Sequence, residues 1–347
     1  MTGKRVDSGR LSIFLRQQGE GREPILVLIH GNLSTGVFFE PLMEELPRDL
    51  SLLAPDLRGF GRSDKLPIDA TKGLKDLAED VHALLEALQL GQRPLHFLGW
   101  SAGGGVIAQY VLLYPEEVAS LILVNPVSPF GYGGTKDEEG TPCTPDFAGS
   151  GAGGVNPAFL EALQKGDRST ENPAGPRQVM NQFYFAPPFR SPREEDFLTA
   201  MLETGISPDI YPGEGASSPY WPFFAPGKRG INNALSPAYL DWSPIVNLER
   251  RPPILWIRGE RDQIVSDASP LDAGYLGQLG LIPGWPGPDE FPPQPMVSQT
   301  RRVLSRYETA GGSVREIVMA GVGHSPHVEN PPEFAKILLS FLREAGI

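Results

Sequence analysis

Apolar residues follow two patterns along this chain, one typical of buried strands and the other of amphipathic helices. An uninterrupted apolar run occupies residues 25–29, and further strands are predicted at residues 94–99 and 118–124, with a weaker candidate at 52–55. A continuous apolar run suits a strand that is buried on both faces, as in a parallel sheet. Residues 11–15 instead alternate apolar and polar positions, which predicts a half-buried strand.

Helical spacing separates these predicted strands. Residues 73–90 carry apolar side chains every three or four positions, and residues 102–114 form a second predicted helix. Strands that alternate with helices over the first 125 residues indicate βαβ units and a mostly parallel sheet. Right-handed crossovers then place helices on both faces of that sheet.

The alternation stops after residue 124 and resumes near residue 253. Short helical patterns at 156–164 and 192–203 lie between loops rich in Gly and Pro. Strands are predicted at 253–257 and 314–319, followed by an amphipathic helix at 331–342. We therefore predict an α/β core made of residues 1–126 and 251–347, with residues 127–250 inserted as a helical cap or lid.

Glycine and proline are unusually frequent, at 40 and 36 of the 347 residues. Both weaken helix and strand interiors, so we expect long ordered loops. Two loops exceed what a compact domain needs: residues 209–233, and about 60 residues after Asp262, of which 266–300 are richest in Gly and Pro. Long loops of this kind are often lids or binding loops.

Aromatic residues on the first of these loops are candidate substrate-binding residues. Tyr220, Trp221 and Phe223 could line an apolar pocket. The alternative is that they anchor the loop to the core. Trp100, beside the serine discussed below, is a further candidate for contact with the substrate.

The charge balance excludes several classes of partner. With 30 basic and 42 acidic residues the formal net charge is −12, which disfavours binding to nucleic acid. We find neither a basic run nor 18 consecutive apolar residues, so no membrane partner is expected. Residues 1–7 lack the apolar stretch of a signal peptide, and the one cysteine, Cys143, cannot form an intrachain disulfide. A soluble cytoplasmic protein is the expectation.

One short segment predicts a nucleophile. Residues 99–103 read Gly-Trp-Ser-Ala-Gly, which fits G-x-S-x-G between a predicted strand and a predicted helix. The tight strand-to-helix turn would expose the Ser101 hydroxyl above the sheet edge, and the small flanking residues would let the two arms of the turn approach. The alternative is a glycine-rich turn in which the serine is incidental.

A serine hydroxyl needs a base to act as a nucleophile. Of the five histidines, His324 follows the last predicted strand, which returns it to the carboxyl edge of the sheet where ligand sites lie. His327 is the competitor and is expected to be a neighbour in the pocket or at the surface. Structural roles are expected for His82, within a helix, and His96, within a strand.

The base in turn needs a carboxylate to orient it. Asp262 follows the penultimate predicted strand, consistent with the chain order Ser, Asp, His. Glu260 is its competitor. A variant arrangement would place the acid directly after residue 124, but that position holds Asn125, which carries no charge.

These motifs together resemble the α/β-hydrolase superfamily, in the branch of capped serine hydrolases that includes carboxylesterases and lactonases. The resemblance rests on residues 30–32 (His-Gly-Asn), residues 56–63 (Asp-Leu-Arg-Gly-Phe-Gly-Arg-Ser), the serine segment, and the segments of Asp262 and His324. It implies an oxyanion hole made by the backbone N–H groups of Asn32 and Ala102. It also implies loop-bracing roles for Asp56 and Arg58, a loop-supporting role for His30, and no metal or organic cofactor.

The expected function is hydrolysis of a carboxylic ester or lactone on a bulky apolar small molecule. A serine at the turn argues against haloalkane dehalogenases and epoxide hydrolases of this superfamily, which use an aspartate there. A carbon–carbon, amide (aminopeptidase-like) or peracid reaction by the same three residues stays open, as does a non-catalytic ligand receptor. An exposed apolar loop is a candidate surface for a homodimer.

Overall fold

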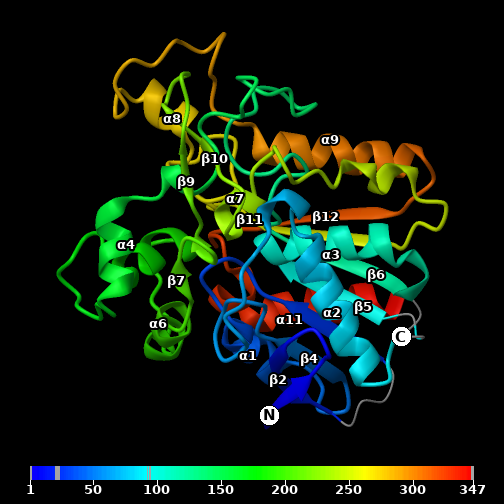
Figure 1. Cartoon of the computed structure of the whole chain (residues 1–347). Coiled ribbons are helices and arrows are strands. Elements are labelled where there is room, and N and C mark those ends of the chain that lie inside the picture. Colours follow the sequence, from blue (N-terminus) through cyan, green and yellow to red (C-terminus); the bar gives the residue numbers. More distant parts are fainter. Residues whose placement is uncertain (1, 20–23, 92, 94, 345–347) are drawn as a thin grey trace.

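A computed structural model of the chain describes residues 2–19, 24–91, 93 and 95–344 (Figure 1). Its centre is an eight-stranded sheet in the order β1-β2-β4-β3-β5-β6-β11-β12. β2 is antiparallel to both of its neighbours, β1 and β4, and all neighbouring pairs from β4 to β12 are parallel. The strands are β1 (Thr2–Asp7), β2 (Ser12–Gln18), β3 (Ile25–Ile29), β4 (Ser51–Pro55), β5 (Leu95–Trp100), β6 (Val118–Val124), β11 (Ile254–Gly259) and β12 (Val314–Met319). The predicted α/β fold with a mostly parallel sheet is confirmed.

The interior strands follow the apolar pattern closely. β3 and β6 have the predicted bounds, and every residue of β3, β4 and β5 is buried. The edge strand β12 also has its predicted bounds, although most of its residues are only half-buried. Pro94, at the start of one predicted strand, lies outside the described residues. β1 was not predicted because its residues are mainly polar and exposed.

The strand predicted at residues 11–15 is present as β2, but the prediction that it is half-buried was wrong. Residues 13–16 of β2 are buried one after another, on both faces of the sheet. The Arg62 guanidinium lies 3.8 Å from the ring centroid of Phe14 and covers the face that the alternation predicted to be exposed. Contacts from distant side chains therefore bury this strand.

Helices cover both faces of the sheet (Figure 1). On one side α2 packs against α3, and on the other α1 packs against α10 and α11. Gly73, at φ 59°, ends a short 3-10 turn, so α2 begins two residues later than the apolar pattern predicted. The core helices are α1 (Glu40–Glu45), α2 (Lys75–Ala87), α3 (Ala102–Leu113), α8 (Ala273–Gln278), α9 (Met296–Thr309), α10 (Pro326–Glu329) and α11 (Pro331–Glu344), with 3-10 turns η1 (Gly36–Phe39), η2 (Ala70–Lys72) and η3 (Pro115–Glu117).

Residues 127–250 run between β6 and β11 and contribute no strand to the large sheet. We call them the insertion. Its helical elements lie beside the carboxyl-edge loops of the sheet (Figure 1). They are α4 (Pro157–Gln164), α5 (Pro176–Val179), the π-helical turn η5 (Met180–Tyr184), α6 (Glu194–Leu202) and α7 (Ile231–Ala234), with 3-10 turns η4 (Ala152–Gly154) and η6 (Ser243–Asn247) and strands β7 (Ile206–Ser207), β8 (Tyr211–Pro212), β9 (Gly215–Ser217) and β10 (Phe224–Pro226). The last two strands show that residues 209–233 are not wholly irregular.

The prediction of one long loop between Asp262 and His324 was also wrong. The segment contains α8 and the 14-residue helix α9. The buried face of α9 mixes apolar Val303 and Leu304 with polar Gln299 and Thr300, which hid its helical pattern in the sequence.

Gln299 shows why that helix face buries polar groups. Its carbonyl oxygen accepts hydrogen bonds from Ser128 Oγ at 2.6 Å and Gln294 Nε2 at 2.8 Å. Its amide donates to Thr135 Oγ1 at 2.9 Å. Because a buried amide is costly unless it is paired, this side chain fixes α9 against the start of the insertion.

No helix in the described part of the chain is long and apolar enough to cross a bilayer.

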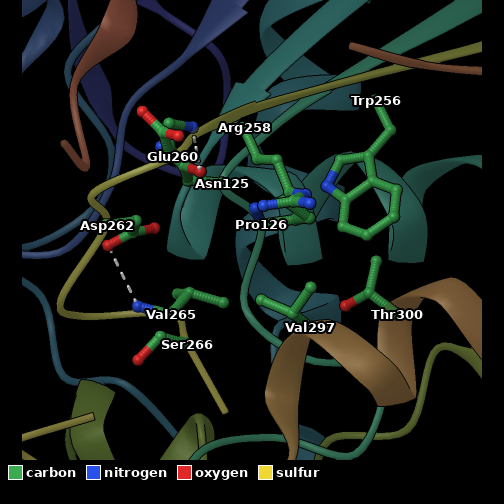
Figure 2. A pocket seen from close by; sticks show the side chains of 11 residues that line it. Asn125, Pro126, Trp256, Arg258, Glu260, Asp262, Val265, Ser266, Val297 and Thr300 are labelled. Carbon is green, nitrogen blue, oxygen red and sulfur yellow. Dashed lines mark hydrogen bonds between the residues drawn. The ribbon is translucent and has the colours of Figure 1, made fainter. Parts of the chain in front are cut away.

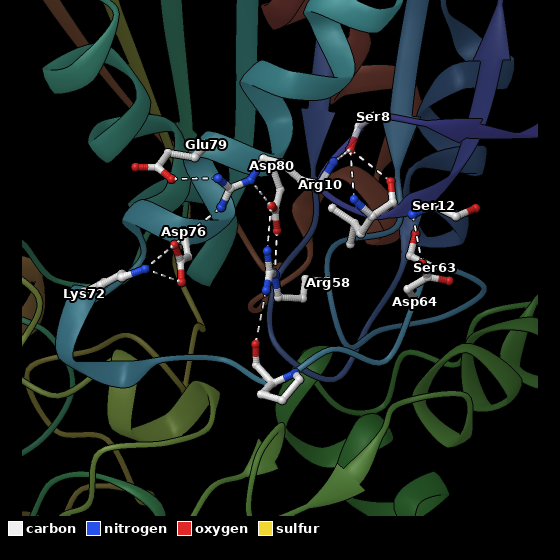
Figure 3. A network of polar contacts seen from close by, with 12 residues as sticks. Ser8, Arg10, Ser12, Arg58, Ser63, Asp64, Lys72, Asp76, Glu79 and Asp80 are labelled. Atoms are coloured by element: carbon white, nitrogen blue, oxygen red, sulfur yellow. Dashed lines mark hydrogen bonds and ion pairs between the residues drawn. The ribbon is translucent and has the colours of Figure 1, made fainter.

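Residues 56–63 form the turn that follows β4, and a charged network holds it (Figure 3). Arg58 donates two hydrogen bonds to Asp80 of α2, at 2.7 and 2.8 Å. Asp80 also accepts from Arg10 at 2.7 Å. At the other end of the turn, buried Asp56 accepts from the backbone N–H groups of Gly36 and Arg62. These contacts match the loop-bracing roles expected for Asp56 and Arg58.

We predict that Asp80→Ala lowers the free energy of unfolding by about 2 kcal/mol or more, because it leaves the mostly buried Arg58 guanidinium without its carboxylate. Chemical denaturation measures this change. The matched control is Lys72→Ala, which removes a half-exposed ion pair with Asp76 from the same network. The control should change stability by no more than about 0.5 kcal/mol. Equal effects of the two variants would contradict the prediction.

Candidate active site

Ser101 lies at the sharp turn between β5 and α3. Its backbone has φ 57° and ψ −122°, a conformation that costs an L-residue energy and often occurs at functional sites. A Cβ on Gly99 would lie 2.3 Å from the Gly103 carbonyl oxygen, and a Cβ on Gly103 would lie 2.1 Å from the Ile29 carbonyl oxygen. The turn therefore requires glycine at both positions, as the motif predicts.

His324 and Asp262 form a buried pair. His324 Nδ1 lies 2.9 Å from Asp262 Oδ2, and both side chains are almost fully buried. The other carboxylate oxygen accepts hydrogen bonds from the backbone N–H groups of Ile264 and Val265. These bonds fix the carboxylate, which in turn fixes the orientation of the imidazole. Glu260, the competing acid, instead accepts a hydrogen bond from the Gly321 N–H group.

Trp100 holds the loop that carries His324, which we call the histidine loop, beside the turn that carries Ser101. Its indole N–H donates to the His324 carbonyl oxygen at 2.7 Å, and the two ring centroids are 5.6 Å apart. Ser101, Asp262 and His324 follow β5, β11 and β12, so all three lie at the carboxyl edge of the sheet. Trp100 itself is buried and stacks on Phe38.

Asn125, the first residue after β6, connects the loops of the acid and the histidine. Its side-chain amide donates to the carbonyl oxygens of Gly323 at 3.2 Å and His324 at 2.8 Å. Its side-chain oxygen accepts from the Gly259 N–H group at 3.1 Å. From the sequence, Asn125 was only excluded as the acid, because its side chain carries no charge. The structure shows a neutral side chain using both donor and acceptor.

Glu329 holds the same histidine loop from another direction. Its carboxylate accepts hydrogen bonds from the Gly323 N–H group at 2.9 Å and from the Ala186 N–H group of the insertion at 2.8 Å. Burial raises the pKa of this carboxyl, while the three backbone N–H groups around it and His324 act in the opposite direction. The sequence analysis did not identify Glu329.

The loop of residues 30–34 passes directly beside the serine. A Cβ on Gly31 would lie 2.8 Å from Ser101 Cβ. His30 Nε2 accepts from the Leu57 N–H group at 2.9 Å, so its Nδ1 carries the proton and donates to the Gly31 carbonyl oxygen at 2.8 Å. Burial lowers the pKa of His30 to about 4, which keeps it neutral. The loop-supporting role expected for His30 agrees with these contacts.

The other histidines lie in packed surroundings. His82 contacts Glu117 at 3.1 Å, and His96 contacts Ser120 at 2.7 Å. His327 is fully buried against the rings of Phe39 and Trp100, so the expectation of a position at the surface was wrong. Burial lowers the pKa of His327 to about 3, so it stays neutral.

The aromatic candidates from the first long loop have different surroundings. Trp221 is buried, packs edge-on against Phe291 at 4.8 Å between ring centroids, and donates to the Pro283 carbonyl oxygen. It therefore joins the two long loops. Tyr220 and Phe223 are 44% and 61% exposed, so neither is enclosed in a pocket in this structure.

A small cavity of about 50 Å³, partly open to solvent, lies next to the acid. Asp262 and Asn125 line it, but Ser101 and His324 do not. Figure 2 shows Asp262 and Trp256 on opposite sides of this space. It is therefore separate from the predicted substrate pocket over the serine. Within the described ranges, no group of three or more His, Cys, Asp or Glu side chains could hold a metal ion.

Two residues of the insertion reach the site and were missed in the sequence. Tyr184, at the end of η5, donates from its hydroxyl to the Asn32 carbonyl oxygen at 3.0 Å. Asn232 of α7 accepts from the Asn32 side-chain amide at 2.8 Å. No local pattern identifies either residue, because their partner lies 152 and 200 residues away.

A strained serine turn with a His–Asp pair, at the carboxyl edge of an open α/β sheet, is the arrangement of serine hydrolases with an α/β-hydrolase fold. The family model described as alpha/beta hydrolase fold matches residues 24–152. A similar protein is the 2-(acetamidomethylene)succinate hydrolase of Mesorhizobium japonicum, which is 33% identical over 83% of this chain and 88% of its own length. The chain belongs to the α/β-hydrolase fold family.

Two other similarities agree with this assignment. The monoacylglycerol lipase ABHD6 of Homo sapiens is 29% identical over 106 residues, which are 30% of this chain and 31% of that protein. The solved structure of a thermophilic esterase from Thermogutta terrifontis superposes with a TM-score of 0.60 at 18% identity, and all of both chains is covered. At that identity the structural likeness concerns the fold.

We predict that Asn125→Asp lowers the free energy of unfolding by about 2–4 kcal/mol, because a buried carboxylate would face two carbonyl oxygens to which the amide now donates. Thermal and chemical denaturation at pH 7 measure the change. Asn156→Asp is the matched control, since the exposed cap of α4 only accepts a hydrogen bond and aspartate does this equally well. If Asn125→Asp is as stable as the wild type, Asn125 does not hold the loops of Asp262 and His324 together.

Proposed function

We propose that this protein is a serine hydrolase that cleaves carboxylic esters or lactones, with Ser101 as nucleophile, His324 as general base and Asp262 as the orienting acid. The observation that carries the proposal is the buried His324–Asp262 pair, at 2.9 Å, on the sheet edge where Ser101 lies. A histidine whose Nδ1 is engaged by a carboxylate offers its Nε2 as a base. Acyl transfer to serine and then to water follows.

Two backbone N–H groups are suited to bind the oxyanion. Ala102 is the first residue of α3, so its N–H group has no acceptor within the helix. The N–H group of Asn32 likewise makes no hydrogen bond within the described residues. The close approach of Gly31 to Ser101 supports this assignment, because Asn32 and Ala102 are the next residues along the two segments that meet there. Fixed backbone donors stabilise charge that develops in the transition state.

We infer a bulky, mainly apolar small-molecule substrate, with the insertion acting as the cap. The aromatic surroundings of Trp100 and Tyr184 support an apolar site. The relative named monoacylglycerol lipase supports ester chemistry. Tyr220 and Phe223 could contact the substrate if the loop of residues 209–233 changes position, whereas Trp221 would support that loop from within.

Amide hydrolysis is the second candidate. It is favoured by the relative that covers most of the chain, whose name includes an acetamido group. The same three residues serve this reaction if His324 passes its proton to the leaving nitrogen. The two candidates differ in the bond cleaved and not in the residues that cleave it.

We predict that Ser101→Ala reduces kcat at least about 10³-fold, because the other groups cannot replace the nucleophile. Steady-state rates on p-nitrophenyl esters, lactones and arylamides measure the loss and identify the preferred bond. A fluorophosphonate probe should label wild-type Ser101, as located by peptide mass spectrometry.

The exposed Ser305→Ala variant serves as control and should retain wild-type rates. Retained hydrolysis by Ser101→Ala, or labelling of another residue, would refute the nucleophile. Turnover of arylamides but not of esters would select the second candidate.

A further inference from the structure

The insertion contacts Asn32 at two points, and core residues hold the rest of its loop. Tyr184 Oη donates to the Asn32 carbonyl oxygen at 3.0 Å and lies 3.4 Å from that of Leu33. The Asn32 side-chain amide donates to Asn232 Oδ1 at 2.8 Å. Both insertion residues therefore act on the residue whose backbone N–H group is a proposed oxyanion donor.

Core contacts hold this loop on both sides of Asn32, since Leu33 and Ser34 are buried. The Gly31 carbonyl oxygen accepts from His30 Nδ1 at 2.8 Å and from Ser34 Oγ at 2.7 Å. Asn32 makes one local contact, in which its Oδ1 accepts from the Leu33 N–H group at 3.0 Å. Leu33 has φ 45°, a strained value for a bulky residue, so this turn needs outside contacts to persist.

Packing fixes the position of the Tyr184 hydroxyl. The side chain is 8% exposed, and its ring lies 6.0 Å from Phe38, 5.8 Å from Trp100 and 6.3 Å from His324 between centroids. It comes at the end of the π-helical turn Met180–Tyr184, a rare local geometry that often occurs at functional sites. A hydroxyl on a ring held this firmly sets the direction of the carbonyl it binds.

The same short segment reaches the histidine loop. Two residues after Tyr184, the Ala186 N–H group donates to Glu329 Oε2 at 2.8 Å. Glu329 also accepts from the Gly323 N–H group, next to His324. Residues 184–186 therefore join the loop of the proposed oxyanion donor to the loop of the proposed base.

From these contacts we infer that Tyr184, assisted by Asn232, is a positioning residue that holds the carbonyl and side chain of Asn32 in place. His30 and Ser34 hold the Gly31 carbonyl, which shares a planar peptide unit with the Asn32 N–H group, so the oxyanion hole needs both the core contacts and those of the insertion. The inference rests on the proposed function and deepens it. The hole is then fully formed only while residues 180–186 and 231–234 are seated on the core. An insertion that moves to admit substrate assembles the oxyanion hole as it returns.

Tyr184→Phe tests this inference, because it keeps the ring packing and removes only the hydroxyl. We expect kcat on an oxygen ester to fall about 10- to 100-fold, with KM changed less than about threefold. The loss is smaller than the roughly 10²–10³-fold caused by deleting an oxyanion donor, because here a donor is misdirected and not removed. Tyr239→Phe, a half-buried tyrosine of the insertion that does not contact Asn32, should retain kcat within about twofold.

A thionoester of the same acid supplies the discriminating measurement. Its developing negative charge rests on sulfur, a weak hydrogen-bond acceptor, so its hydrolysis depends little on the oxyanion hole. Tyr184→Phe should therefore slow the thionoester less than about threefold. Equal slowing of both esters, a change confined to KM, or wild-type rates throughout would each overturn the inference.

Labelling by the fluorophosphonate probe distinguishes a failure of the positioning role of Tyr184 from a failure of the proposed hydrolase function. If wild-type Ser101 is not labelled, the proposed function itself fails. If Ser101 is labelled and required while Tyr184→Phe behaves as wild type, only the positioning role fails. Unchanged thermal unfolding of Tyr184→Phe would confirm that a rate loss does not come from unfolding.

Discussion

The turn from β5 into α3 exists only because two backbone segments approach more closely than any side chain allows. Gly99 and Gly103 face backbone atoms at distances where a Cβ cannot fit. This close approach puts Ser101 into its strained backbone conformation, directly before α3, whose first N–H group has no acceptor within the helix. Gly31 extends the constraint to the neighbouring loop, so the serine and both proposed oxyanion donors depend on three missing Cβ atoms.

Buried hydrogen bonds then hold the loops that meet at this edge. Asn125 connects the ends of β6 and β11 to the histidine loop, and Trp100 binds that loop from the serine turn. Glu329 completes the connection to the insertion. Each bond uses a donor or acceptor that would be costly to bury alone, so these loops are fixed as a group.

The insertion therefore has two kinds of contact with the rest of the molecule. Gln299 and its partners attach its beginning to α9 through a fully paired polar cluster. Tyr184 and Asn232 contact the loop beside the serine. The aromatic residues of the long loops divide similarly, since Trp221 packs against Phe291 while Tyr220 and Phe223 reach the surface.

The sequence by itself determined the features that depend on neighbouring residues. A continuous apolar run predicted β3 and a mainly apolar segment predicted β6, both with correct bounds, and the glycine pattern around Ser101 predicted the sharp turn. Asp262 and His324 could be placed at one edge because parallel strands end there. Only the tertiary structure decided that α9 is a helix with a polar buried face, that Asn125 connects two loops, and that Tyr184 and Asn232 hold Asn32. Those contacts join residues more than 130 positions apart, and their energy depends on packing that no local pattern encodes.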